Sequence, residues 1–209
     1  MTTIPTLAAP PERATVLHQD PLIFQVDDVI DAATCQHIIG LAQPQRRRAE
    51  VSGAQKGQQS AGRTNDVVWL KHDTTPTTAR ICRALAELVG LPLVNAESMQ
   101  VITYEVGQEY RPHFDAYDLS TPRGQRCCAR GGQRLATLLA YLSDVDEGGE
   151  TTFPRLGVAV PPKRGRALVF HNCSPGTDTR HPDTLHAGAP VKGGTKWAFN
   201  LWFHVGPFR

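Results

Sequence analysis

The chain has 209 residues with 40% apolar and 20% charged side chains and a formal net charge of +2, which is typical of a single globular domain. The charge is spread out except at residues 46–48 (RRR), interpreted as a solvated helix end, so neither nucleic acid nor a membrane is expected as a partner. No apolar run reaches the roughly 20 residues of a membrane-spanning helix. The five cysteines show no CxxC spacing, and the first residues lack the basic start and long apolar stretch of a signal peptide. We therefore expect free thiols and a cytoplasmic protein.

The beginning of the chain predicts few regular elements. Residues 1–20 contain three prolines and few large apolar side chains, so we expect an extended, loosely held arm ahead of one domain over 21–209. A strand is predicted at 22–26. It is followed by a helix that Asp31 can cap and that runs to about Gln43.

The next segment predicts a loop and then a second helix. The polar, glycine-bearing stretch 45–65 has no hydrophobic periodicity and predicts a mobile loop. Pro76 suits the first turn of a helix, and apolar residues recur at helical spacing from there to Gly90.

The remainder of the chain predicts short strands rich in β-branched and aromatic residues and separated by Gly and Pro turns. These strands are expected at 98–105, 134–142, 150–153, 166–171 and 195–205. The predicted helices come first in the chain and the short strands follow them. This order predicts an α+β fold whose main body is a β-sandwich or jelly roll, with the helices as N-terminal support.

The last predicted strand has two chemically different faces. Alternation places Trp197 and every second residue up to Phe203 on an apolar face suited to a core. The opposite face carries Lys196, Asn200, Trp202 and His204, a set that suits a cavity for a polar ligand better than a core.

Three residues offer a ligand set for a non-haem ferrous ion. His113 and Asp115 are two residues apart, so on an extended segment both side chains point to the same side and can reach one metal ion. Pro112 removes a ladder donor just before them, which predicts a strand end or barrel mouth. His186 would supply the second imidazole of a two-histidine, one-carboxylate site. Lys196 could neutralise the far carboxylate of a dicarboxylic acid whose near end chelates the metal.

Three separated runs agree in content and order with one known family: QVITYEVGQEYRPHFDAYD (100–118), GGQRLATLLAYLSDVDEGGETTFP (131–154) and LHAGAPVKGGTKWAFNLWFH (185–204). Together they resemble the catalytic domain of prolyl 4-hydroxylases, which are Fe(II)/2-oxoglutarate dioxygenases with a double-stranded β-helix fold. The resemblance is close over about 95–205.

The resemblance implies a role for thirteen residues. The iron ligands are expected to be His113, Asp115 and His186. The cosubstrate 2-oxoglutarate is expected to contact Lys196, Tyr104, Thr137 and Asn200. The substrate side is expected to be lined by Arg134, Trp202, Tyr110, Glu97 and His204, with Arg63 in a segment that covers the peptide.

His181 is the main rival for the distal ligand, but only His186 is followed by the HxGxPV run and by a lysine at the tenth position.

The implied reaction is oxidation of an unactivated C–H bond by O2, with 2-oxoglutarate converted to succinate and CO2; ascorbate is a further expected cofactor. The first hypothesis for the substrate is a prolyl residue in a peptide or protein. The second is a free amino acid or another small molecule. The third hypothesis is a binding module that has kept the jelly roll without turnover.

Overall fold

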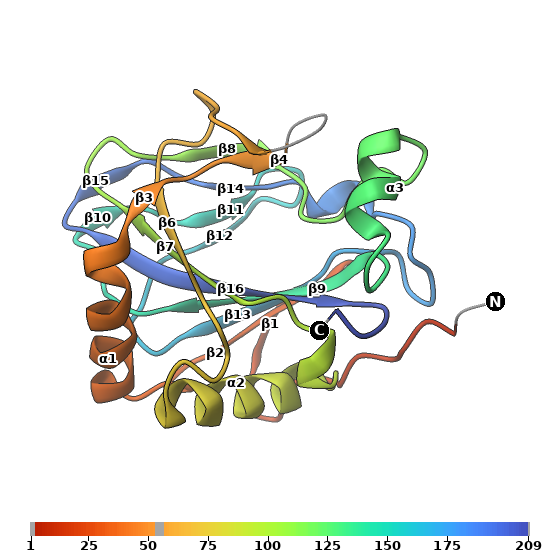
Figure 1. The fold of residues 1–209 in the computed structure, drawn as a ribbon, viewed down its shortest axis with the longest axis horizontal. Helices are drawn as coiled ribbons and strands as arrows, with labels where there is room; N and C mark the ends of the chain where they lie inside the picture. The colour runs from red at the N-terminus through yellow and green to blue at the C-terminus, as the bar shows by residue number, and fades with distance from the viewer. Residues whose placement is uncertain (1–2, 53–56, 209) are drawn as a thin grey trace.

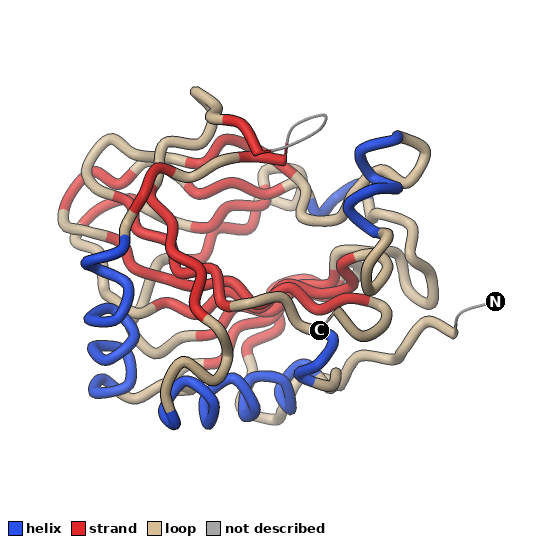
Figure 2. Tube along the Cα trace, in the orientation of Figure 1, coloured by secondary structure: helices blue, strands red, loops and turns tan. Residues whose placement is uncertain are grey.

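The computed structural model describes residues 3–52 and 57–208 of the chain. Within that part, the strands form two stacked antiparallel layers, shown in red in Figure 2, with two helices against the outside of the larger layer. This arrangement confirms the predicted α+β fold with a jelly-roll body and N-terminal supporting helices.

The larger sheet runs through the middle of the molecule (Figure 1). Its eight described strands are, in spatial order, β1 (Thr15–Gln19), β2 (Leu22–Val26), β13 (Ala167–His171), β9 (Arg134–Tyr141), β16 (Lys196–His204), β7 (Met99–Tyr104), β6 (Asp66–Leu70) and β3 (Arg47–Arg48). The smaller sheet contains, in the described residues, β12 (Val158–Val160), β11 (Thr151–Phe153), β14 (His186–Gly188) and β8 (Tyr110–His113). Two short pairs complete the set: β10 (Glu147–Gly148) with β15 (Val191–Gly193), and β4 (Val51–Ser52) with β5 (Gly57–Gln58).

Two helices, α1 (Ala32–Ala42) and α2 (Pro76–Val89), cover the outer face of the larger sheet. Asp31 caps α1 by accepting a hydrogen bond from the Thr34 N–H. Gly90 ends α2 at a φ of 78°, a left-handed conformation that glycine adopts without steric cost. Short 3₁₀ turns occupy Gln43–Gln45, Leu93–Asn95 and Pro182–Thr184.

The two faces of β16 separate the two main cores, as the alternation of its sequence predicts. Trp197, Phe199, Leu201 and Phe203 pack with the helices in the outer core. Ala198 packs in the inner core between the sheets. Of the polar residues on the inner face, Lys196, Asn200 and Trp202 line a cavity between the two layers, where a ligand can be enclosed.

The predicted strands and both long helices are confirmed, with ends shifted by one or two residues. Other segments differ from the prediction. Part of the arm, Thr15–Gln19, pairs with β2 as strand β1. The polar stretch 45–65 carries β3, β4 and β5, and Arg47–Arg48 lie in β3 beyond the end of α1. Residues 53–56 of the predicted mobile loop lie outside the described residues.

A third helix, α3 (Pro122–Cys128), lies apart from the other two, near one end of β9 and beside the chain that leaves β8 (Figure 1). Over residues 3–52 and 57–208, no helix has the length and apolar character needed to cross a membrane.

Candidate active site

Three potential metal ligands meet on the smaller sheet. His113 ends β8 and His186 begins β14, and the two are direct partners across the antiparallel ladder. Asp115 follows His113 by two residues, just beyond β8. The Nε2 atoms of His113 and His186 lie 3.8 Å and 3.5 Å from the two carboxylate oxygens of Asp115. One donor atom from each residue lies within 4.8 Å of the other two, a spacing that a single ion can bridge.

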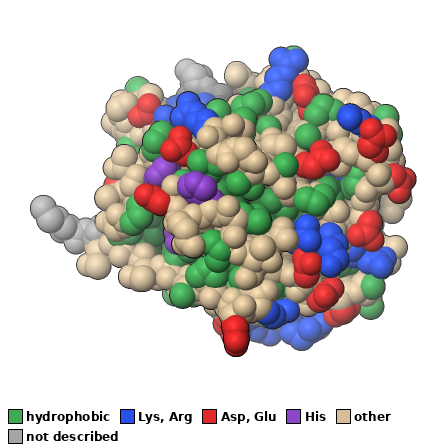
Figure 3. All heavy atoms as spheres, turned by 180° about the vertical axis from the view of Figure 1, so that it is seen from behind, with side chains coloured by type: hydrophobic (Ala, Val, Ile, Leu, Met, Phe, Trp, Pro, Cys, Tyr) green, Lys and Arg blue, Asp and Glu red, His purple; other side chains and the backbone are tan. Residues whose placement is uncertain are grey.

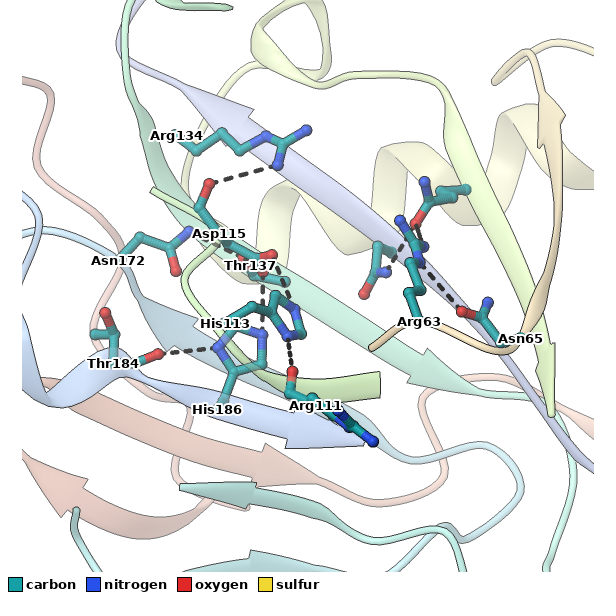
Figure 4. Close-up of polar contacts among 12 residues, drawn as sticks. Arg63, Asn65, Arg111, His113, Asp115, Arg134, Thr137, Asn172, Thr184 and His186 are labelled. Atoms are coloured by element: carbon teal, nitrogen blue, oxygen red, sulfur yellow. Dashed lines mark hydrogen bonds and ion pairs between the residues drawn. The ribbon is translucent and has the colours of Figure 1, made fainter. Parts of the chain in front are cut away.

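Main-chain hydrogen bonds orient both imidazoles (Figure 4). His113 Nδ1 is 2.9 Å from the Arg111 carbonyl oxygen, and His186 Nδ1 is 2.9 Å from the Thr184 carbonyl oxygen. Because a carbonyl oxygen only accepts, each Nδ1 carries the hydrogen, and the Nε2 lone pair is left for a metal.

The donor set has the protonation that a ferrous ion requires. Burial, together with the neighbouring His186, lowers the pKa of His113 to about 3. Burial raises the pKa of Asp115, but the two imidazoles and Arg134 outweigh it and hold this pKa below its ordinary value. At neutral pH, His113 is therefore a neutral donor and Asp115 a charged one. Two imidazoles and one carboxylate on one face fit non-haem Fe(II), with further positions open for other ligands.

Thr137, which the resemblance predicts for the cosubstrate, supports the carboxylate of Asp115. Its hydroxyl donates a 2.7 Å hydrogen bond to Asp115 Oδ2. The side-chain amide of Asn172 donates in turn to Thr137 Oγ1 at 2.9 Å. These two hydrogen bonds orient the Asp115 carboxylate. Because the Thr137 oxygen accepts from Asn172, the hydrogen of the Thr137 hydroxyl is directed to Asp115.

Lys196 lines a cavity together with the three ligands. The side chain is 2% exposed, and its Nζ donates to the Gly149 carbonyl oxygen at 2.7 Å. Burial lowers the pKa of this amine to about 7. Lys196 makes no ion pair with any carboxylate of the described residues. A buried amine with a free side toward a cavity fits a bound carboxylate.

Two other predicted cosubstrate residues line the same cavity, namely Tyr104 and Asn200. The ring of Tyr104 lies 5.2 Å from Lys196 Nζ. Burial raises the pKa of the Tyr104 phenol, so its hydroxyl stays protonated and can donate to an anion. The structure thus brings together three of the four residues predicted for the cosubstrate.

The structure shows why positions 148 and 149 are both glycine, which the sequence alone did not reveal. Both residues have positive φ, 76° and 73°. A Cβ atom on Gly148 would lie 2.3 Å from the Pro190 carbonyl oxygen. The turn thereby brings the Gly149 carbonyl oxygen to the amine of Lys196.

A second cavity of about 130 Å³ adjoins the first and shares His113 and Asp115 with it. Arg63, Tyr110, Arg134 and Trp202 line it, as the resemblance implies. The Arg134 guanidinium carbon lies 3.9 Å from the ring centroid of Trp202, and the Arg63 guanidinium carbon lies 4.6 Å from that of Tyr110. Two cation–aromatic pairs therefore form part of its wall.

Glu97 and His204, which the resemblance predicts for the substrate side, lie behind Arg134 and are not among the residues that line the two cavities. Glu97 Oε1 is 2.6 Å from Arg134 Nε and 2.9 Å from His204 Nε2. Burial raises the pKa of Glu97, but Arg134 and His204 outweigh it and bring it to about 2. Glu97 therefore stays charged and holds the Arg134 side chain against Trp202.

The rival ligand His181 is absent from the cluster. Its Nδ1 accepts a hydrogen bond from the Asp183 N–H, and its Nε2 lies 3.5 Å from Asp20. This supports the choice of His186 from its HxGxPV context.

Sequence reasoning missed several residues of the second cavity: Glu50, Val51, Trp69, Gln100, Phe114, Tyr117 and Arg123. Trp69 is 41% exposed, and its ring centroid lies 6.0 Å from that of Trp202. Tyr117 could have been found, because it follows Asp115 by two residues. Trp69 and Arg123 carry no such signal.

The chain matches the sequence profile of the 2OG-Fe(II) oxygenase superfamily over residues 99–204. It belongs to this family of 2-oxoglutarate-dependent dioxygenases, whose metal is Fe(II) and whose cosubstrates are 2-oxoglutarate and O2. The donor set described above fits that metal.

Within this family, the chain is similar in sequence to prolyl 4-hydroxylases. The chain is 33% identical to "Probable prolyl 4-hydroxylase 3" of Arabidopsis thaliana, over 93% of this chain and 73% of that protein. It is 36% identical to "Prolyl 4-hydroxylase subunit alpha-3" of Rattus norvegicus, over 96% of this chain and 37% of that subunit. Among solved structures, the viral collagen prolyl hydroxylase of Paramecium Bursaria Chlorella virus-1 in its 2OG complex has a TM-score of 0.68 and 28% identity, covering 86% of this chain and 94% of the viral one.

Proposed function

We propose that the protein hydroxylates a prolyl residue in a peptide or protein, with His113, Asp115 and His186 as the iron ligands. The likeness to prolyl 4-hydroxylases over more than 90% of the chain supports this substrate. The observation that carries the proposal is the position of the Arg134–Trp202 pair, which lines a cavity together with His113 and Asp115. A substrate in this cavity would lie directly beside the metal.

In this proposal, 2-oxoglutarate binds with its far carboxylate at the Lys196 amine and near the Tyr104 hydroxyl. Iron and 2-oxoglutarate, when bound, supply the oxidising power that inserts an oxygen atom from O2 into a C–H bond. Fe(II) carries two positive charges, which Asp115 and the near carboxylate of the cosubstrate balance. The far carboxylate is balanced by Lys196, so the loaded site is nearly neutral and tolerates burial.

On the substrate side, the residues of this chain position the reacting carbon and exclude water. The flat Arg134–Trp202 pair provides a rigid wall for a proline ring, and Glu97 prevents Arg134 from swinging away. Tyr110 stacks on the iron ligand His113 with ring centroids 3.5 Å apart and closes the cavity on that side. These groups handle no proton of the substrate; they hold it in place.

The experiment measures succinate formation by the Fe(II)-loaded enzyme with and without a proline-rich peptide, together with mass spectrometry of the peptide. We expect peptide-stimulated succinate and a product heavier by one oxygen atom on proline. Turnover with free amino acids alone would favour a small-molecule substrate. Turnover with neither would contradict the proposal.

We further propose that ascorbate sustains turnover and that the protein works in the cytoplasm. The second point is supported by the cysteines, since Cys35, Cys82, Cys127, Cys128 and Cys173 are free. Comparing turnover with and without ascorbate tests the first point, and fractionation of the producing cell tests the second.

A further inference from the structure

We infer that the mouth of the substrate cavity binds an acidic side chain that flanks the target prolyl residue, so that acidic proline-containing peptides are the preferred substrates. This inference rests on the proposed function. It is carried by three arginines, Arg123, Arg155 and Arg180, which we call the basic rim.

Arg123 brings a positive charge to the cavity that holds the iron ligands. It lies on α3 and lines the same cavity as His113 and Asp115. The residue is exposed, and its guanidinium carbon lies 5.8 Å from the ring centroid of Tyr117. Among the described carboxylates, Arg123 has no ion-pair partner. Its charge is thus free to meet a group on a bound substrate.

Two further guanidinium groups of the rim lie against Phe114, which also lines this cavity. The guanidinium carbons of Arg155 and Arg180 are 5.8 Å and 4.3 Å from its ring centroid. Arg155 donates to a carbonyl oxygen, that of Pro182, and has no carboxylate partner in the described part of the chain. Its charge is therefore uncompensated.

The acidic groups near the mouth do not balance these arginines. Glu97 is already paired with Arg134, at 2.6 Å, behind the cavity wall. Asp118 lies 3.9 Å from Arg180, and both side chains are partly exposed, so this pair holds the arginine weakly. Glu50 lines the cavity but is exposed. Among these three acidic residues, Glu50 alone makes no ion pair within the described residues.

A fourth cation lies deeper in the same cavity. Arg63 is 7% exposed, and its described hydrogen bonds go to uncharged oxygens of Asn65, Glu50 and Gln100, at 3.1, 3.0 and 3.0 Å. A buried guanidinium without a carboxylate partner adds to the positive potential of the cavity.

Away from the mouth, several basic side chains lie close to acidic ones. On the face of the molecule seen in Figure 3, acidic and basic side chains lie next to one another. Elsewhere on the molecule, Asp27 pairs with both Lys163 and Arg166, at 2.8 Å and 2.6 Å. A peptide with Asp or Glu close to its proline therefore finds its complement at the basic rim.

The test uses peptides of equal length around one proline-rich core, with both termini capped so that no terminal carboxylate contributes. Residues flanking the target proline are Glu, Gln or Lys. Dissociation constants are measured by fluorescence anisotropy on the enzyme loaded with Fe(II) and 2-oxoglutarate without oxygen, and KM is then measured with oxygen. Another arm compares the Gln peptide with a free and an amidated C-terminus, which separates an acidic side chain from a terminal carboxylate as the source of the anion.

We expect the Glu peptide to bind more tightly than the Gln peptide by about two- to fivefold for each rim contact, and the Lys peptide to bind least. The preference should shrink between about 0.02 M and about 0.5 M salt, because exposed charges are screened. Arg123→Gln and Arg155→Gln should weaken the preference for the Glu peptide over the Gln peptide, and Arg123→Lys should keep it. Arg83→Gln, on an exposed position of α2, is the matched control and should change nothing.

Equal affinity for the three peptides, or a preference unchanged in both rim variants, would overturn the inference. If the peptides are hydroxylated equally well, the inference fails while the proposed function stands. If none is bound or hydroxylated, both fail. The inference would also be overturned if the Gln peptide with a free C-terminus bound as tightly as the capped Glu peptide. The anion that the rim recognises would then be a terminal carboxylate and not an acidic side chain.

Discussion

Lys196 makes the affinity for 2-oxoglutarate depend on pH. In the free protein its pKa is lowered to about 7 by burial. A carboxylate bound at the amine favours the charged form and raises this pKa, so binding takes up a proton wherever the free amine is neutral. The affinity should be highest below the free-state pKa and should fall as pH rises through it.

The size of the effect follows from the fraction of protonated amine. With a pKa near 7, about 90% of Lys196 is charged at about pH 6 and about 10% at about pH 8. The affinity should therefore drop about tenfold over this range, or about 1.4 kcal/mol. Calorimetry at pH 8 in buffers of different ionisation enthalpy should show uptake of nearly one proton for each 2-oxoglutarate bound.

The control is Lys196→Arg, whose guanidinium stays charged over the whole range. Its affinity for 2-oxoglutarate is expected to be lower because the larger group fits poorly, yet independent of pH. The iron ligands are the same in both proteins, so any contribution from them appears in both. The reasoning is refuted if the wild-type affinity is flat between pH 6 and 8, or if the arginine variant shows the same slope.

Three further predictions concern the metal ligands and their support. His186→Ala should abolish binding of Fe(II) measured by calorimetry, whereas His181→Ala should leave it intact; equal loss in both would contradict the assignment. Thr137→Val should weaken iron binding by about tenfold or more, because the carboxylate ligand loses its hydroxyl donor; unchanged affinity would remove Thr137 from the site. Glu97→Gln should lower the free energy of unfolding in urea by about 3 kcal/mol, since Arg134 is left buried without its carboxylate. The pKa of Glu97 is lowered from 4.5 to about 2, so the deficit should be present above pH 4.5 and vanish as pH falls toward 2, which urea titrations at several pH values can check.

The iron ligands and Lys196 could be predicted because their geometry is local or follows the pleat. His113 and Asp115 are two residues apart on an extended segment, and alternation along β16 places Lys196 and Asn200 on the inner face. The same rule fails at the end of β16. A register irregularity between Phe203 and His204 lies where β16 meets β9, and His204 reaches Glu97 behind the cavity wall. Such irregularities leave no mark in a pattern of alternating residues.

Other parts of the site depend on contacts between distant segments. Thr137 lies on an inward-facing strand position, as predicted, but which group it meets depends on where the chain after β8 crosses β9. Strand β6 directly follows the polar stretch 45–65 and was not among the predicted strands, so Trp69 was missed with it. Helix α3 has only seven residues, too few for a helical periodicity to be recognised, so neither it nor Arg123 was predicted.

The imidazoles of His113 and His186 are both anchored to a main-chain oxygen two residues upstream, at Arg111 and Thr184. Because every amino acid carries that oxygen, the hydrogen bonds that orient the metal-binding nitrogens do not depend on which side chains occupy positions 111 and 184. A mutational library that reshapes the surroundings of the metal can therefore randomise the exposed position 111 while the orientation of His113 is kept. Position 184 tolerates less variation, because Thr184 is 1% exposed and its hydroxyl donates to the His181 carbonyl oxygen.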